Sequence, residues 1–147
     1  MNQVFAGTVI SILLVAASLS IHSRVLRATS GYVESPHPLL PRPMITVMTV
    51  IFLIHMLEIA LFAMAFYAMG ATGLGELTGA YSSTPTDYFY FSIATYSTLG
   101  IGDITPSGAI RMVAGVEALA GLLLIAWSAS FTYLMMERLW ANDHDKG

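Results

Sequence analysis

Apolar residues fill three long stretches of the chain, at residues 4–21, 44–69 and 110–136. Each is near or above the ~20 residues that an α-helix needs to cross about 30 Å of hydrocarbon. The second and third stretches exceed that minimum, which permits a tilted helix. The pattern therefore predicts an all-α membrane protein with three transmembrane helices in each chain.

A fourth apolar stretch, "DYFYFSIATYS" at residues 87–97, is too short to cross a bilayer. As a helix it would be roughly 16 Å long, about half of the hydrocarbon thickness. Thr84 or Asp87 can cap its start, and Gly100 and Gly102 follow its end. Because irregular backbone at membrane depth is tolerated only where it is buried in protein or lines water, these residues predict a re-entrant segment.

Charged residues between the spans indicate how the chain is oriented. The connection between the first and second spans carries Arg24, Arg27 and Arg42 against Glu34. Cytoplasmic loops are enriched in Lys and Arg, whereas residues 70–87 contain neither. We therefore expect the N-terminus and the re-entrant segment on the outer side of the membrane, and the C-terminus in the cytoplasm.

The composition fits a chain that is surrounded by lipid. Hydrophobic residues make up 56% of the sequence and charged residues only 10%, whereas soluble domains have about a quarter charged residues. The chain has no cysteine, which excludes a disulfide framework and a thiolate metal site. Its net charge of -3 offers no basic patch for nucleic acid.

The residues after the short helix, "TYSTLGIGDITP" from Thr95 to Pro106, suit the coordination of a cation. A dehydrated monovalent cation can be held by backbone carbonyls when several copies of an extended loop surround one axis. Gly100 and Gly102 allow the φ values that turn successive carbonyls the same way, and the Thr98 hydroxyl adds an oxygen. The negative C-terminal end of the preceding helix also favours a cation.

Residues 87–131 resemble the pore region of tetrameric potassium channels, in particular the small channels with two helices and a pore loop. The filter pattern of that family, T-V-G-Y-G-D, corresponds here to "TLGIGD" at residues 98–103. Thr95 and Pro106 match flanking positions, and Gly121 in "LAGLLL" matches the glycine of the inner helix.

The resemblance implies a passive potassium channel, not an enzyme, in which four identical chains surround a pore in a bacterial inner membrane. K⁺ is then the permeant ion without an organic cofactor, and the expected partners are the other copies and lipid. The implied ion ligands lie in the filter, at Thr98, Leu99, Gly100, Ile101 and Gly102. The implied supporting residues are Tyr90, Thr95, Asp103 and Glu117, the implied hinge is Gly121, and the implied pore-lining residues are Leu122, Ile125, Ala129 and Tyr133.

Three of these positions allow two interpretations each. Asp103 can attract cations from outside or anchor the filter from behind. Glu117 can bind an ion or brace the pore helix, with Ser92, Thr95 or Tyr96 as its partner. Gly121 can bend the inner helix or permit close helix packing.

Ile101 departs from the family pattern, which has a tyrosine that holds the filter at a fixed width. Isoleucine can pack against the pore-helix residues Tyr90 and Phe91 but cannot donate a hydrogen bond. Its carbonyl is unchanged, so the coordination sites are retained. The substitution therefore predicts potassium preference with weaker selectivity.

The resemblance also divides the chain. We expect an N-terminal transmembrane helix at residues 1–28, a cytoplasmic linker at 29–43 with four prolines that cannot continue a helix, a pore domain at 44–136 and a cytoplasmic tail at 137–147. Within the pore domain we expect an outer helix at 44–69, a pore helix at 87–97, the filter at 98–103 and an inner helix at 108–136.

His55 and Glu58 are three residues apart near the middle of the second span, so they share a helix face. Ionisable groups inside a bilayer are costly and are candidates for function. Glu58 can be a structural group that is protonated or hydrogen-bonded, or the pair can sense protons. A metal site would need ligands on neighbouring helices, and the sequence indicates none.

Two other functions are compatible with the same residues. One is a weakly selective or non-selective cation channel on this scaffold, and the other is a non-conducting membrane sensor or assembly subunit. Voltage sensing is excluded, because none of the three spans carries a run of arginines.

Overall fold

A computed structural model describes residues 2–33 and 42–144 of the chain. These residues form four α-helices and a small two-stranded sheet, in the order α1 (Asn2–Val33), α2 (Pro43–Ala71), β1 (Leu77–Gly79), α3 (Pro85–Tyr96), β2 (Ile104–Pro106) and α4 (Gly108–His144). The helices α1, α2 and α4 are each long and apolar enough to cross a membrane. The predicted class, an all-α membrane protein with three spans, is confirmed.

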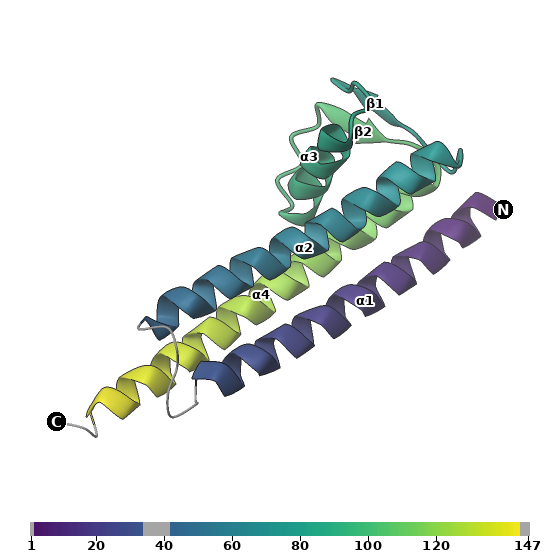
Figure 1. Ribbon diagram of the computed structural model, residues 1–147. Helices are drawn as coiled ribbons and strands as arrows, with labels where there is room; N and C mark the ends of the chain where they lie inside the picture. The colour runs from purple at the N-terminus through teal and green to yellow at the C-terminus, as the bar shows by residue number, and fades with distance from the viewer. Residues whose placement is uncertain (1, 34–41, 145–147) are drawn as a thin grey trace.

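The three long helices lie side by side, and α3 and the two strands gather at one end of them (Figure 1). The N-terminus lies at that same end and the C-terminus at the opposite end. In this bundle α1 packs mainly against α4, and α3 packs in the angle between α2 and α4. The short helix therefore enters from one end and stops partway along the bundle, as a re-entrant segment does.

An aromatic and aliphatic core fixes α3 against the long helices. Phe66 of α2 and Phe91 of α3 are buried, and their rings meet edge to face with centroids 5.2 Å apart. Ile110 and Val113 of α4 are fully buried in the same cluster. Because interiors are close-packed, this cluster determines where α3 ends and where the residues after it begin.

The buried side of α1 consists largely of small and polar residues. Gly7, Ser11, Ser18 and His22 recur at helical spacing along this side. A Cβ on Gly7 would lie 3.2 Å from the Ala109 carbonyl oxygen of α4, so the two helices approach closely at this point. Small residues are typical of helix contacts in membranes, where van der Waals packing replaces the hydrophobic effect.

The helices are longer than the sequence predicts. α1 continues to Val33, past the expected end at residue 28, because Leu26 and Val33 extend its buried side beyond the first arginines. α4 likewise runs to His144, through most of the predicted tail. Most of the proline-rich linker, at residues 34–41, lies outside the described residues.

The sheet was not predicted. β1 and β2 pair antiparallel in a register that places Leu77 opposite Pro106 and Gly79 opposite Ile104. Each strand has three residues, which is too short for an alternating pattern to be visible in the sequence. The pair joins the loop after α2 to the residues that directly follow the predicted filter.

Candidate ion filter and the carboxyl groups around it

The first turn of α3 is held by both predicted caps. The Thr84 hydroxyl accepts a hydrogen bond from the Asp87 amide at 3.3 Å. Asp87 Oδ2 in turn accepts from the amides of Thr84 at 3.1 Å and Ser82 at 3.0 Å. These bonds to Thr84 and then to Ser82 lower the pKa of Asp87. This capping box starts α3 two residues before the predicted position, with Pro85 in its first turn.

The other end of α3 leads directly into the predicted filter. The helix ends at Tyr96, one residue earlier than expected, and Ser97 is its C-cap. The Thr98 amide donates to the Thr95 carbonyl at 2.9 Å, and the Gly100 amide donates to the Ala94 carbonyl at 3.1 Å. The inner half of the filter is therefore fastened to the last turn of α3.

The backbone of the filter alternates in handedness. Thr98, Gly100 and Gly102 have φ values of 58°, 55° and 86°, whereas Leu99 and Ile101 are not in the positive-φ region. Alternation between left-handed and right-handed backbone turns successive carbonyls toward the same side of the strand. Glycine adopts positive φ without strain, but Thr98 does so at a cost that surrounding contacts must offset.

The side chains of Leu99 and Ile101, which lie between these positions, are exposed in a single chain. Leu99 is 66% exposed and Ile101 is 55% exposed. The expected support for Ile101 is otherwise engaged, since the Phe91 ring packs on Phe66 and the Tyr90 hydroxyl bonds Asp103. Apolar side chains exposed in this way commonly mark a surface that another molecule covers.

Asp103 makes the contacts of an anchor. Its Oδ2 accepts a hydrogen bond from the Tyr90 hydroxyl at 2.9 Å, and its Oδ1 accepts from the Ile104 amide at 3.0 Å. Its carbonyl accepts from the Ala80 amide at 2.9 Å. The bond to Asp103 raises the pKa of Tyr90, which keeps the phenol protonated as the donor. The outer end of the filter is thus joined to α3 and to the residues after β1.

Gly79 makes this outer attachment possible. It has a φ of 109°, and a Cβ at this position would collide with the Asp103 carbonyl oxygen. Beside it, the Thr78 and Thr105 hydroxyls form a hydrogen bond of 3.0 Å across the strand pair. The loop after α2 can therefore approach the filter only with glycine at this position.

Glu117 of α4 lies behind α3 and is fully buried. The Ser92 hydroxyl lies 2.5 Å from Glu117 Oε1 and 2.9 Å from the Ile59 carbonyl oxygen, but it has one proton for these two acceptors. Among the described residues, Glu117 Oε2 has no hydrogen-bond partner. One proton on the carboxyl group supplies the missing bond and avoids a buried charge, so we infer that Glu117 is the neutral acid.

Gly121 lies one turn further along α4, against the end of α3. A Cβ at this position would collide with the Tyr96 carbonyl oxygen. Helix α4 runs without interruption from Gly108 to His144. These contacts match the close-packing interpretation of Gly121, which lets the pore-helix end and α4 touch. The expected pore-lining residues Leu122, Ile125, Ala129 and Tyr133 are all exposed in a single chain.

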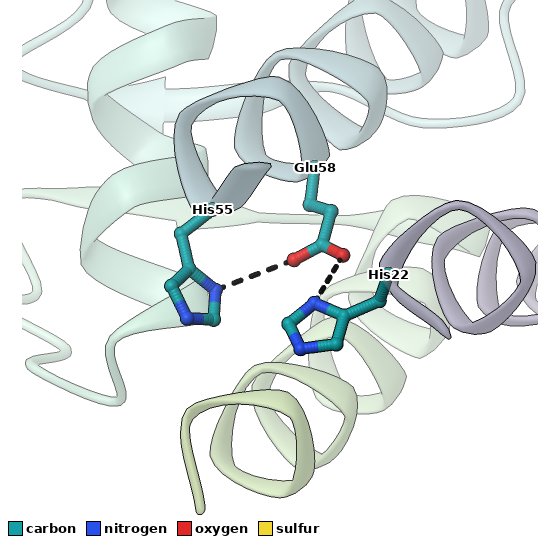
Figure 2. A group of neighbouring side chains, drawn as sticks. All are labelled: His22, His55 and Glu58. Atoms are coloured by element: carbon teal, nitrogen blue, oxygen red, sulfur yellow. Dashed lines mark hydrogen bonds and ion pairs between the residues drawn. The ribbon is translucent and has the colours of Figure 1, made fainter. Parts of the chain in front are cut away.

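Glu58 of α2 lies between His55 of the same helix and His22 of α1 (Figure 2), and it belongs to a buried polar cluster that also includes residues of α3 and α4. Its Oε1 lies 2.9 Å from His22 Nδ1 of α1, and its Oε2 accepts from the Tyr96 hydroxyl of α3 at 2.6 Å. His55 Nδ1 lies 3.3 Å from the same Oε2. Ser128 Oγ of α4 lies 3.1 Å from Nε2 of both histidines.

Sequence reasoning missed His22 and Ser128. His22 lies just past the apolar stretch at residues 4–21, where no candidate ligand was expected. The structure places it beside Glu58, so the expectation that no neighbouring helix offers a further ligand was wrong. The available signal was helical spacing, because Ser11, Ser18, His22 and Leu26 fall on one side of a continuous helix. Tyr96, considered as a partner for Glu117, instead bonds Glu58.

A family model described as "Ion channel" matches residues 54–138, which is more than half of the chain. The chain therefore belongs to this family of pore-loop ion channels, and the resemblance inferred from the filter residues is confirmed. The matched range includes α3, the filter and most of α4, and it excludes α1.

The chain is also similar to the inward rectifier potassium channel Kirbac3.1 of Paramagnetospirillum magnetotacticum. The two sequences are 34% identical over 86 residues, which is 58% of this chain and 28% of the relative. The chain thus spans less than a third of the length of this relative.

Proposed function

We propose that four copies of this chain surround one axis and conduct K⁺ passively across the membrane. The observation that supports the proposal is the alternating sign of φ from Thr98 to Gly102, because such a backbone can turn successive carbonyls to one side. One chain offers only one side of a coordination cage. Four copies would form successive rings of carbonyl oxygens that replace the hydration shell of the ion, with the Thr98 hydroxyl at the inner end.

The exposed surface supports assembly around that axis. Four large apolar or aromatic side chains are at least half exposed in one chain, namely Leu99, Ile101, Leu122 and Tyr133. In the proposed tetramer the filter residues face the axis and the neighbouring subunits, and the exposed side of α4 lines a water-filled cavity below. Lipid covers the remaining outer surface, with the N-terminus outside and the C-terminus in the cytoplasm of a bacterial cell.

Ion flux into liposomes tests this function. Purified protein is reconstituted, and uptake is measured first under a potassium gradient and then under a sodium gradient, followed by a reversal potential in mixed ions. We expect potassium to permeate better than sodium. Gly100→Asp, which places a side chain and a charge in the carbonyl ring, should abolish the flux, whereas Gly31→Ala in α1 should not, because nothing lies within 4 Å of a Cβ there.

A weakly selective cation channel is the second candidate, and Ile101 is the observation that favours it. Its side chain is 55% exposed and cannot donate a hydrogen bond to hold the filter at a fixed width. Equal permeability for potassium and sodium would assign this function, and Ile101→Tyr should then restore discrimination. Absence of flux under both gradients would instead indicate a non-conducting subunit.

A further inference from the structure

The cluster of His22, His55 and Glu58, called here the His–Glu cluster, lies in the membrane-spanning part of the bundle and includes none of the filter residues 98–103. His22 and Glu58 are fully buried, and the side chain of His55 is 14% exposed. The nitrogen and oxygen ligand atoms of all three lie within 4.8 Å of one another. Figure 2 shows both imidazole rings directed at the same carboxylate from opposite sides.

These residues and two hydroxyl groups form a closed ring of short contacts. The ring runs from Glu58 to His22 at 2.9 Å, from His22 to Ser128 at 3.1 Å and from Ser128 to His55 at 3.1 Å. It continues from His55 to the Tyr96 hydroxyl at 2.8 Å and returns to Glu58 at 2.6 Å. Each of the five contacts requires one hydrogen or one bonded cation between its two atoms.

The ring lacks one positive charge when its groups are in their ordinary states. Two neutral imidazoles and two hydroxyls bring one proton each, which makes four protons for five contacts. An ionised Glu58 also leaves a net negative charge buried at membrane depth, which is costly. A bound cation balances the carboxylate charge and takes the place of the missing proton, and a divalent cation leaves the cluster with a net charge of +1.

We propose that the His–Glu cluster is a binding site for a divalent transition metal of the Zn²⁺ class. Two imidazole nitrogens and one carboxylate oxygen are a common donor set for zinc in sites that keep a fourth position open. Imidazole suits Zn²⁺, Cu²⁺ and Ni²⁺ better than Mg²⁺ or Ca²⁺, which prefer oxygen ligands. The metal binds Nδ1 of His22, Nδ1 of His55 and Oε1 of Glu58.

The surrounding hydroxyls match the outer contacts that such a site needs. Metal-bound histidines donate their second ring N–H to an acceptor that fixes the ring, and here Nε2 of both rings lies 3.1 Å from Ser128 Oγ. That oxygen has two lone pairs and can accept from both. The Tyr96 hydroxyl donates to Glu58 Oε2 at 2.6 Å and leaves Oε1 for the metal.

The spacing and the access of the cluster are compatible with a metal. A tetrahedral zinc ion with bonds of about 2.0–2.1 Å places its ligand atoms about 3.3 Å apart. The distance of 2.9 Å from His22 Nδ1 to Glu58 Oε1 is already close to this value. His55 Nδ1 lies 3.3 Å from the other carboxylate oxygen, Oε2, so the His55 ring has to move toward Oε1 to share the metal. A groove of about 520 Å³ between α2 and α4 is lined by both His55 and Ser128 and provides an entry path.

The experiment measures metal binding by the full chain in detergent, without any flux assay. Protein stripped with EDTA and freed of its affinity tag is dialysed against Zn²⁺, and bound metal is counted by mass spectrometry. We expect one Zn²⁺ per chain and a higher melting temperature. With Co²⁺ as the probe, we expect the intense visible absorption of a tetrahedral site, and this readout needs no variant.

Substitutions test which residues bind the metal. His22→Gln should abolish binding, and Ser128→Ala should weaken it about tenfold while the stoichiometry is retained. The matched control is the double variant His37→Gln and His144→Gln, which removes the other two histidines of the chain and should still bind one metal.

Three results would overturn the proposal: no uptake of either metal, loss of binding in the control variant, or the weak absorption of six-coordinate Co²⁺. If no metal binds but the melting temperature depends on pH in a way that His22→Gln removes, the ring holds a proton instead. A chain that binds metal but conducts no ions would retain this inference while losing the proposed channel function.

Discussion

Glu58 and Glu117 are both fully buried carboxyl groups that contact α3, but their surroundings differ in almost every other respect. Glu58 has partners on α1, on its own helix and on α3, and two of them are imidazoles. Glu117 has a contact with the Ser92 hydroxyl, and its second oxygen has no partner among the described residues. Near α3 the chain therefore holds one carboxylate among donors and one neutral carboxylic acid.

This difference shows two ways in which α3 is attached to the long helices. At Tyr96, next to the filter, α3 is joined to a charge-bearing network that spans every long helix. At Ser92, one turn earlier, it is joined to α2 and α4 by uncharged hydrogen bonds. Removing one member of a charged network lowers the free energy of unfolding more than removing one uncharged hydrogen bond, because the remaining groups stay buried and unpaired.

The largest expected effect comes from the two carboxyl groups themselves. Glu58→Gln should lower the free energy of unfolding by about 1–3 kcal/mol for each buried imidazole or hydroxyl donor that the amide leaves unpaired. Glu117→Gln keeps a neutral group of similar shape and should cost about 1 kcal/mol. Denaturation of the purified variants in detergent measures both changes. Equal losses would show that the two carboxyl groups are held in the same way.

The second-largest loss of stability is expected at the contact between α3 and α4 at Gly121. Gly121→Ala places a Cβ against the Tyr96 carbonyl oxygen. We expect a loss of about 1–3 kcal/mol from overpacking, together with reduced ion flux. Gly115→Ala in the same helix is the control, because nothing lies within 4 Å of a Cβ there, and it should be neutral or slightly stabilising. Similar losses of stability at both glycines would mean that the effect comes from the helix backbone rather than from the contact with Tyr96.

The third effect comes from removing the two hydroxyls of α3 that contact these carboxyl groups. Tyr96→Phe removes a bond to a charged group and should cost about 1.5–3 kcal/mol, whereas Ser92→Ala removes neutral hydrogen bonds and should cost about 1 kcal/mol. Thermal denaturation of the two variants gives the order. A larger loss for Ser92→Ala would mean that Glu117, rather than Glu58, carries the charge.

The smallest effect is expected at Asp87, a partly exposed carboxylate that contrasts with both buried groups. Its pKa is lowered by the bonds from the Thr84 and Ser82 backbone. A lowered pKa means that its contribution is fully present above the ordinary aspartate pKa of about 4 and is lost as the pH falls through the lowered value. The melting temperature should fall in that range. Asp87→Asn should remove this component, and an unchanged pH profile in the variant would contradict it.

Much of the fold followed from the sequence because its signals are local. Three apolar runs and one short run set the spans and the re-entrant helix, and Thr84 with Asp87 predicted how that helix starts. The extension of α1 could not be read from hydropathy, since arginines interrupt the apolar run although the helix continues. The strands are too short to produce a pattern, and their pairing is a contact between distant residues.

The candidate site likewise has one part that could be predicted from the sequence and one part that could not. The filter residues are contiguous, so their glycine spacing was visible. The His–Glu cluster takes one member from α1 and two from α2, and the hydroxyls that contact it come from α3 and α4. The spacing of three residues relates His55 to Glu58, but no spacing along the chain relates that pair to His22 or to the hydroxyls. Asp103 had two interpretations because the Tyr90 contact that distinguishes them depends on how the chain turns after Gly102.

The two attachments of the filter limit how it can move. Its inner end is tied to α3 through Gly100 and Ala94, and its outer end is tied through Asp103 to Tyr90 and Ala80. A short strand fixed at both ends cannot slide along its own direction or shift outward as a unit. The soft motions that remain are rotations of single peptide groups between the fixed ends. In the proposed tetramer, a change in ion preference would therefore arise one carbonyl at a time, by reorientation rather than by widening of the whole ring.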